Sequence, residues 1–75
     1  MRALSELKMG EKATIVGYNF SKPAVLQQLL EMGMTKGTEV TVSKLSPLGD
    51  PREIDIRGYQ LSMRSSEAAL IQVQA

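Results

Sequence analysis

Apolar and polar residues alternate along most of this chain with a period of two, which is the pattern of strands that bury one face. The alternation covers residues 12–17, 39–45 and 70–74, and two further alternating runs stand on either side of Gly58. The chain therefore predicts about five short strands.

One segment follows helical spacing instead. Its apolar stripe consists of Leu26, Leu29 and Leu30, with Val25 at the edge. We expect this helix to begin near Pro23, because proline is tolerated where a first-turn N–H has no partner. It should end at Gly33, which accepts the left-handed conformation, and Ser21 is the expected N-terminal cap.

Shorter features connect these elements. Leu4 and Leu7 are spaced as in a short helical turn that places two leucines in the core. Gly17 predicts a bend or bulge in the first long strand, where another backbone passes close. Residues 65–69 combine capping residues with helix formers, but they are long enough for only one turn.

The most distinctive stretch is a loop followed by a hairpin. Pro47 and Pro51 have a fixed φ and no donor N–H, so residues 46–51 are predicted to form a rigid loop. The alternating runs on both sides of Gly58 and Tyr59 predict a two-residue hairpin. Glycine at the first central position favours a type II′ turn.

Several short strands that share one small core favour a compact β-barrel. We therefore expect a mainly β fold, a partly open barrel of about five strands with one α-helix covering it. Residues 1–75 should form a single domain, because a chain of this length supports one core.

Composition excludes several kinds of chemistry. The chain has no cysteine and no histidine, so disulfides, thiolate metal sites and Ser-His or Cys-His catalysis are excluded. Nine basic and eight acidic residues give a net charge of +1, which provides no general attraction for nucleic acid or anionic membrane. Because the sequence has no membrane span and no secretory signal, we expect a soluble cytoplasmic protein.

The charged residues around the hairpin do not predict a catalytic or metal site. Glu53 and Asp55 share one strand face, and a solvated surface explains them better than acid–base catalysis or a hard-cation site. Arg52, Arg57 and Arg64 lie among these acids, which indicates scattered surface charge instead of a nucleic-acid platform. We expect no metal, no cofactor and no nucleic acid.

A set of apolar residues allows two interpretations. The set consists of Met32, Met34, Pro47 and Leu48. These residues either complete the core of a small domain or line an apolar cleft for a partner segment. Methionine adapts to irregular surfaces, and a stiff loop with Leu48 at its tip suits the wall of a groove.

Three segments together resemble a known family. They are residues 29–37 at the helix end, the Ser-Pro-Leu-Gly-Asp-Pro loop at 46–51, and the hairpin at 54–64. With them, the chain closely resembles FeoA proteins, the small cytoplasmic components of bacterial ferrous iron uptake. The similarity extends from Leu4 to Val73.

This resemblance implies an SH3-like barrel and a non-enzymatic adaptor that binds the membrane transporter FeoB on its cytoplasmic side and modulates iron uptake. It also implies a cytoplasmic protein that FeoB brings to the inner membrane. The residues that match the family's loop and cleft form the expected partner-binding set: Met34, Pro47, Leu48, Gly49, Asp50, Pro51 and Arg64. Arg52 departs from the family, which often has an apolar residue there, and is expected to place charge at the edge of the cleft.

Two other functions remain open from the residues. The domain also resembles the C-terminal domain of iron-dependent repressors, which implies a regulatory interaction domain. A repressor needs a helix-turn-helix domain as well, and we expect none in these 75 residues. Nucleic-acid binding predicts salt-dependent association with oligonucleotides, and exposed edge strands leave a weak homo-oligomer open.

Overall fold

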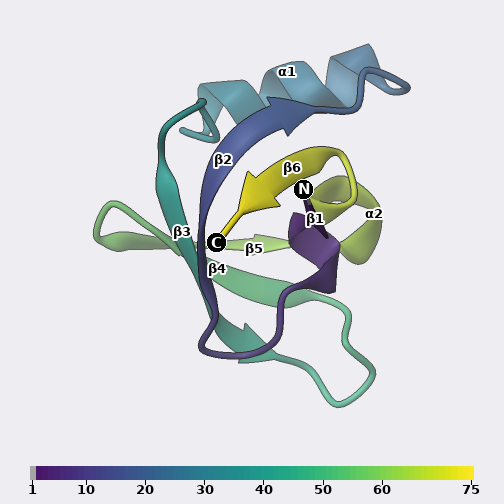
Figure 1. Cartoon of the computed structure of the whole chain (residues 1–75). Helices are drawn as coiled ribbons and strands as arrows, with labels where there is room; N and C mark the ends of the chain where they lie inside the picture. Colours follow the sequence, from purple (N-terminus) through teal and green to yellow (C-terminus); the bar gives the residue numbers. More distant parts are fainter. Residues whose placement is uncertain (1) are drawn as a thin grey trace.

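The computed structural model describes residues 2–75 and contains one antiparallel sheet of six strands. In chain order the strands are β1 (Arg2–Ala3), β2 (Lys12–Tyr18), β3 (Glu39–Leu45), β4 (Arg52–Ile56), β5 (Tyr59–Met63) and β6 (Ile71–Gln74). Their order in the sheet is β1-β6-β2-β3-β4-β5, which leaves β1 and β5 at its edges. The sheet curls around a common interior (Figure 1), so the predicted mainly β, partly open architecture is confirmed.

Three short helices complete the fold. Helix α1 (Pro23–Glu31) lies across the top of the curled sheet in Figure 1, as predicted for a helix that covers it. The 3-10 helix η1 (Leu4–Glu6) and the one-turn helix α2 (Ser65–Ala68) contact each other. Gly33 has a φ of 103°, which confirms its role just beyond the end of α1.

The sequence predicted five strands, and the sixth is β1. Arg2 pairs with Val73 and Ala3 with Gln72, so β1 lies against β6. Two residues are too few to show an alternating pattern, and this strand exists because the fold brings the two ends of the chain together.

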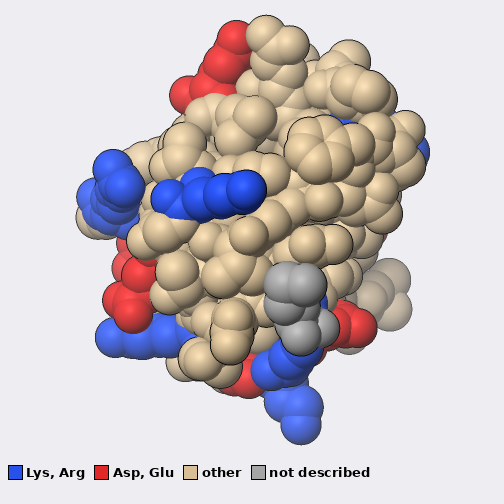
Figure 2. Space-filling model, turned by 45° about the horizontal axis from the view of Figure 1, so that its top comes forward, with Lys and Arg blue, Asp and Glu red and all other residues tan. Residues whose placement is uncertain are grey.

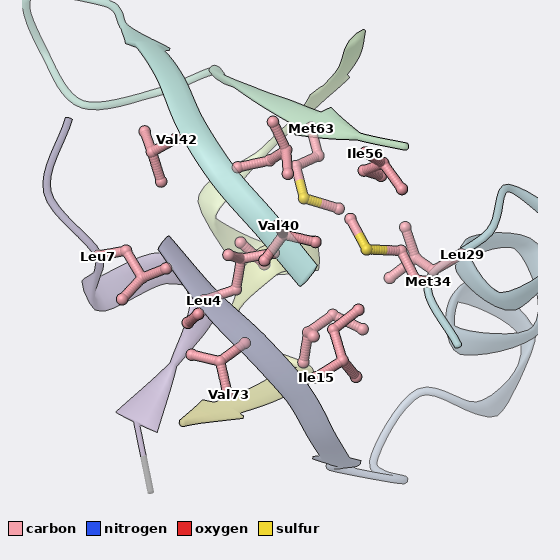
Figure 3. Packing of buried hydrophobic residues seen from close by; sticks show 14 of the residues in the cluster. Leu4, Leu7, Ile15, Leu29, Met34, Val40, Val42, Ile56, Met63 and Val73 are labelled. Carbon is pink, nitrogen blue, oxygen red and sulfur yellow. The ribbon is translucent and has the colours of Figure 1, made fainter. Parts of the chain in front are cut away.

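The core is a cluster of aliphatic residues and two methionines, which come from the inner face of the sheet, from the helices and from the connections between them. Leu4 and Leu7 have exposed fractions of 0% and 2%, which confirms that the first helical turn places both in the core. Figure 3 shows them beside residues from the sheet, from α1 and from the segment between α1 and β3, among them Ile15, Leu29, Met34, Val40, Val42, Ile56, Met63 and Val73.

A bulge interrupts β2 where glycine predicted one. The register between β2 and β6 shifts between Ile15 and Gly17. A Cβ on Gly17 would lie 2.7 Å from Oε1 of Gln72. The predicted close approach is therefore present, but the neighbour is a side chain and not a backbone.

The hairpin turn differs from the prediction by one residue. Ile56 pairs with Tyr59, so the central residues are Arg57 and Gly58, with φ values of 46° and 89°. Positive φ at both positions makes this a type I′ turn instead of a type II′ turn at Gly58-Tyr59. Sequence alternation does not show which residue ends a strand, whereas the pairing with β4 does.

The predicted N-terminal cap of α1 is also wrong. Lys22 occupies the cap position, and no side chain caps the helix there. The N–H of Ser21 instead donates to Oδ1 of Asn19 at 3.0 Å. Asn19 thus forms a local turn with the residue two positions on, which sets the path of the chain before the helix begins.

Candidate partner-binding site

The loop between β3 and β4 is closed by its own hydrogen bonds. The N–H of Gly49 donates to the carbonyl of Ser46 at 2.8 Å, and the N–H of Asp50 donates to Oγ of Ser46 at 2.9 Å. The N–H of Ser46 donates to the carbonyl of Pro51 at 3.3 Å. These bonds hold Leu48 at the tip, where it is 94% exposed. The loop projects at the lower right of Figure 1, away from α1.

Further bonds join this loop to the start of α2. Oδ1 of Asp50 accepts the N–H of Ser65 at 3.0 Å, and Oγ of Ser65 donates to the carbonyl of Gly49 at 3.3 Å. Asp50, Pro51 and Arg64 line a hollow of about 330 Å³ at this junction. The structure therefore brings the loop and Arg64 together, although they are far apart in the sequence.

Met34 does not belong to this surface. Its side chain is 0% exposed and packs in the core, which is the first of the two interpretations that the sequence left open. Met32 lies at the end of α1 and is 44% exposed. We define the loop surface as the predicted residues that the structure places together: Pro47, Leu48, Gly49, Asp50, Pro51 and Arg64.

Arg52 lies inside the protein, so the expectation that it places charge at the edge of a cleft is wrong. Only 6% of this residue is exposed, and its Nη1 donates to the carbonyls of Leu4 at 3.1 Å and Leu7 at 3.0 Å. Arg52 is in step with Ile54 and Ile56 on β4, and both are fully buried. The period of two therefore placed Arg52 on the inner face, but its charge suggested the surface.

Sequence reasoning missed an apolar hollow beside α1. It has a volume of about 520 Å³ and is lined by Phe20, Pro23, Leu26, Gln27, Leu30 and Glu31. Figure 2 shows that most of the surface on this side of the molecule carries neither acidic nor basic residues. The available signal was an aromatic residue, Phe20, among the polar residues just before the helix, and in the structure its side chain is 70% exposed.

The acidic side chains and the helices were also candidates for a function. Within residues 2–75, no three acidic side chains gather as a metal-binding group. Asp55 is exposed on the outer face of β4 and Glu53 is partly exposed beside it, which agrees with a solvated surface. No helix in residues 2–75 is both long enough and apolar enough to cross a membrane.

Comparison with known proteins identifies the family. The FeoA domain matches residues 2–75. A fusion of Fe(2+) transport protein A and the Fe(2+) transporter FeoB from Porphyromonas gingivalis (strain ATCC BAA-308 / W83) is 38% identical over 71 residues. The match covers 95% of this chain and 8% of the fusion protein, so the chain spans a small part of that relative.

Solved structures show the fold. FeoA from Stenotrophomonas maltophilia, described as an SH3 domain protein and solved with zinc, is 27% identical with a TM-score of 0.87 over 99% of this chain and 91% of that protein. A manganese-dependent transcriptional repressor has a TM-score of 0.86 over 96% of this chain and 40% of the repressor. At 18% identity the repressor shows a shared fold alone.

The SH3-like barrel that the sequence resemblance implied is thus confirmed. Because the family match spans every described residue and includes the loop, the hairpin and the helix end, this chain belongs to the FeoA domain family.

Proposed function

We propose that this protein is a non-enzymatic accessory protein of ferrous iron transport, which binds the cytoplasmic part of FeoB and modulates iron uptake. The observation that carries this proposal is the fusion in P. gingivalis, where a region 38% identical to this chain is part of the same polypeptide as FeoB. When two domains are joined in one chain, each has a high effective concentration near the other. A contact that separate proteins must make by binding then becomes intramolecular. The protein therefore works in the cytoplasm, at the inner membrane when FeoB holds it.

We assign the contact to the loop surface. Leu48 is an apolar side chain that is 94% exposed, and the bonds between Ser46, Asp50 and Ser65 fix the loop that carries it. A loop backbone that is already held in place loses little conformational entropy on binding, and burial of an exposed apolar side chain is favourable. Arg64 adds an exposed cation beside Asp50 and Pro51, at the end of the same loop, for a carboxylate of the partner.

A binding titration tests this proposal. Purified FeoB in detergent or nanodiscs is titrated with the protein in the presence of GDP, of a GTP analogue, and without nucleotide. We expect saturable binding that Leu48→Asp weakens at least about tenfold, since a charge would replace the anchor of the interface. Met9→Asp is the matched control, because Met9 is an apolar residue that is 64% exposed and lies outside the loop surface.

Circular dichroism confirms that each variant is folded. Equal binding by wild type and Leu48→Asp would move the contact away from the loop surface. Absence of binding in every nucleotide state would contradict the adaptor function itself. The regulatory alternative is supported only by a shared fold, whereas the fusion links this family directly to the transporter.

A further inference from the structure

Strand β5 forms one edge of the sheet and lacks the features that usually protect such an edge. Its sequence, Tyr-Gln-Leu-Ser-Met, contains no charged residue and no proline. Its pairing with β4 runs without a bulge from the Ile56–Tyr59 pair to the Arg52–Met63 pair. Soluble proteins usually interrupt an edge strand with lysine, proline or a bulge, because its open N–H and C=O groups recruit other strands.

The outward-pointing backbone groups of β5 belong to Gln60 and Ser62. Ile56 and Tyr59 close the two-residue turn and exchange both of their backbone bonds, and such pairs alternate along an antiparallel ladder. Leu61 therefore bonds to β4, whereas Gln60 and Ser62 direct their N–H and C=O groups away from it. Both residues are exposed, and neither backbone pairs elsewhere within residues 2–75.

The two faces of this edge differ in chemistry. On the inner face, Leu61 is half-buried and packs against the core. On the outer face, Gln60 lies opposite Asp55, and Ser62 lies opposite Glu53. Neither carboxylate forms an ion pair in the part of the chain that the structure describes, where the ion pair found is that of Arg2 with Glu11.

We infer that the edge of β5 binds an extended segment of a partner protein in which apolar and basic residues alternate. The backbone of the segment pairs with Gln60 and Ser62, and its apolar side chains cover the exposed edge of Leu61. Neighbouring strands lie about 4.8 Å apart, so a lysine on the outer face reaches over β5 toward Asp55 and Glu53. This edge adjoins the loop surface at Arg64, which follows β5, but the pairing uses Gln60 and Ser62 and does not depend on binding to FeoB.

Charge argues against a second copy of this chain as the occupant. If two β5 strands paired, the outer face beside Asp55 and Glu53 would receive Gln60 and Ser62 of the other copy. Neither residue carries a charge, so the two carboxylates would gain no cation. A segment with basic residues at these positions supplies that charge.

Amide hydrogen exchange with synthetic peptides tests this inference. The probe is a capped seven-residue peptide that alternates lysine and valine. The control peptide has the same composition with all lysines before all valines. We expect the alternating peptide to slow exchange of the Gln60 and Ser62 amides at least about tenfold and to leave the already bonded Leu61 amide little changed. The control peptide should slow neither.

Two substitutions distinguish backbone pairing from electrostatic attraction of the basic peptide to the protein. Ser62→Pro removes an outward N–H without removing a bond to β4, and it should weaken peptide binding at least about tenfold. Ser62→Thr keeps the N–H and should bind as wild type does. A peptide methylated on its backbone nitrogens gives the same test without any change to the protein, and it should not bind.

Three results would overturn the inference. The first is unchanged exchange at Gln60 and Ser62 with the alternating peptide. The second is equal slowing by the two peptides of identical composition. The third is slow exchange at these amides in the free protein that depends on protein concentration, because a second copy would then occupy the edge.

Discussion

At the scale of single residues, Arg52 is the least expected feature of this protein. Its guanidinium group is buried, and its Nη1 bonds to two backbone carbonyls of the N-terminal segment, those of Leu4 and Leu7. No acidic side chain pairs with it within residues 2–75, and its Nε is buried without a partner there. Arg52 therefore fastens η1 to β4 by satisfying carbonyls that water cannot reach.

We predict that Arg52→Ala destabilises the protein by about 3 kcal/mol, because it leaves the buried Leu7 carbonyl unpaired, leaves the Leu4 carbonyl with the Leu7 N–H alone, and opens a cavity. Arg64→Ala is the control, since Arg64 is exposed, and it should change stability by less than about 0.5 kcal/mol. Urea unfolding followed by circular dichroism measures both. Equal stabilities of the two variants would show that the bonds to Leu4 and Leu7 contribute nothing.

A second prediction at this scale concerns acid. The hydrogen bond from Arg2, aided by the backbone N–H of Lys8, lowers the pKa of Glu11 from 4.5 to about 2. The unfolded chain binds a proton at the ordinary pKa, so the stability that Glu11 contributes is present above pH 4.5 and is lost as pH falls toward 2.

Glu11→Gln should therefore melt at a lower temperature than wild type at neutral pH, and the difference should shrink over that acid range. Thermal unfolding at several pH values measures it, with Glu31→Gln as the control at an exposed glutamate. High salt should also reduce the difference, because the Arg2–Glu11 pair is partly exposed. A difference that stays constant from neutral pH to pH 2 would contradict the assignment.

At the scale of elements, the β4–β5 hairpin depends on its turn. Gly58 has a φ of 89°, where a Cβ is strained, although the space around it is open. We predict that Gly58→Ala costs about 1 kcal/mol of stability. Gly17→Ala is the contrasting variant, because it crowds only the flexible end of the Gln72 side chain and should cost less. Denaturant unfolding of both variants checks the order, and the reverse order would contradict the type I′ turn.

At the scale of the whole molecule, burial and not residue type decides how much a leucine contributes to the stability of the fold. Leu4 is 0% exposed in the core, and Leu48 is 94% exposed at the loop tip. We predict that Leu4→Ala destabilises the protein by about 2–4 kcal/mol, a large share of the roughly 4–11 kcal/mol expected for a domain of this size. Leu48→Ala should change stability by less than about 0.5 kcal/mol.

Urea unfolding compares these two variants directly. Because Leu48 contributes little to folding, loss of FeoB binding in a Leu48 variant can be attributed to the interface. A large loss of stability on Leu48→Ala would mean that the loop tip packs on the protein and is not available to a partner.

The sequence by itself determined the five longer strands, helix α1 and most of the core. Alternation at Val40 and Val42, or at Ile54 and Ile56, specifies which face is buried without any knowledge of the partner strand. Helical spacing and terminal signals such as Gly33 likewise act within a few residues. Such patterns are readable because they depend on local geometry.

Only the tertiary structure decided where segments distant in the sequence meet. It placed Arg52 against the N-terminal turn, Met34 in the core, and Arg64 beside the end of the loop at Asp50 and Pro51. It also added β1 and set the hairpin turn one residue earlier, since pairing with a neighbouring strand fixes both. The physical reason is that burial and hydrogen-bond partners are properties of the assembled fold, whereas periodicity is a property of each segment alone.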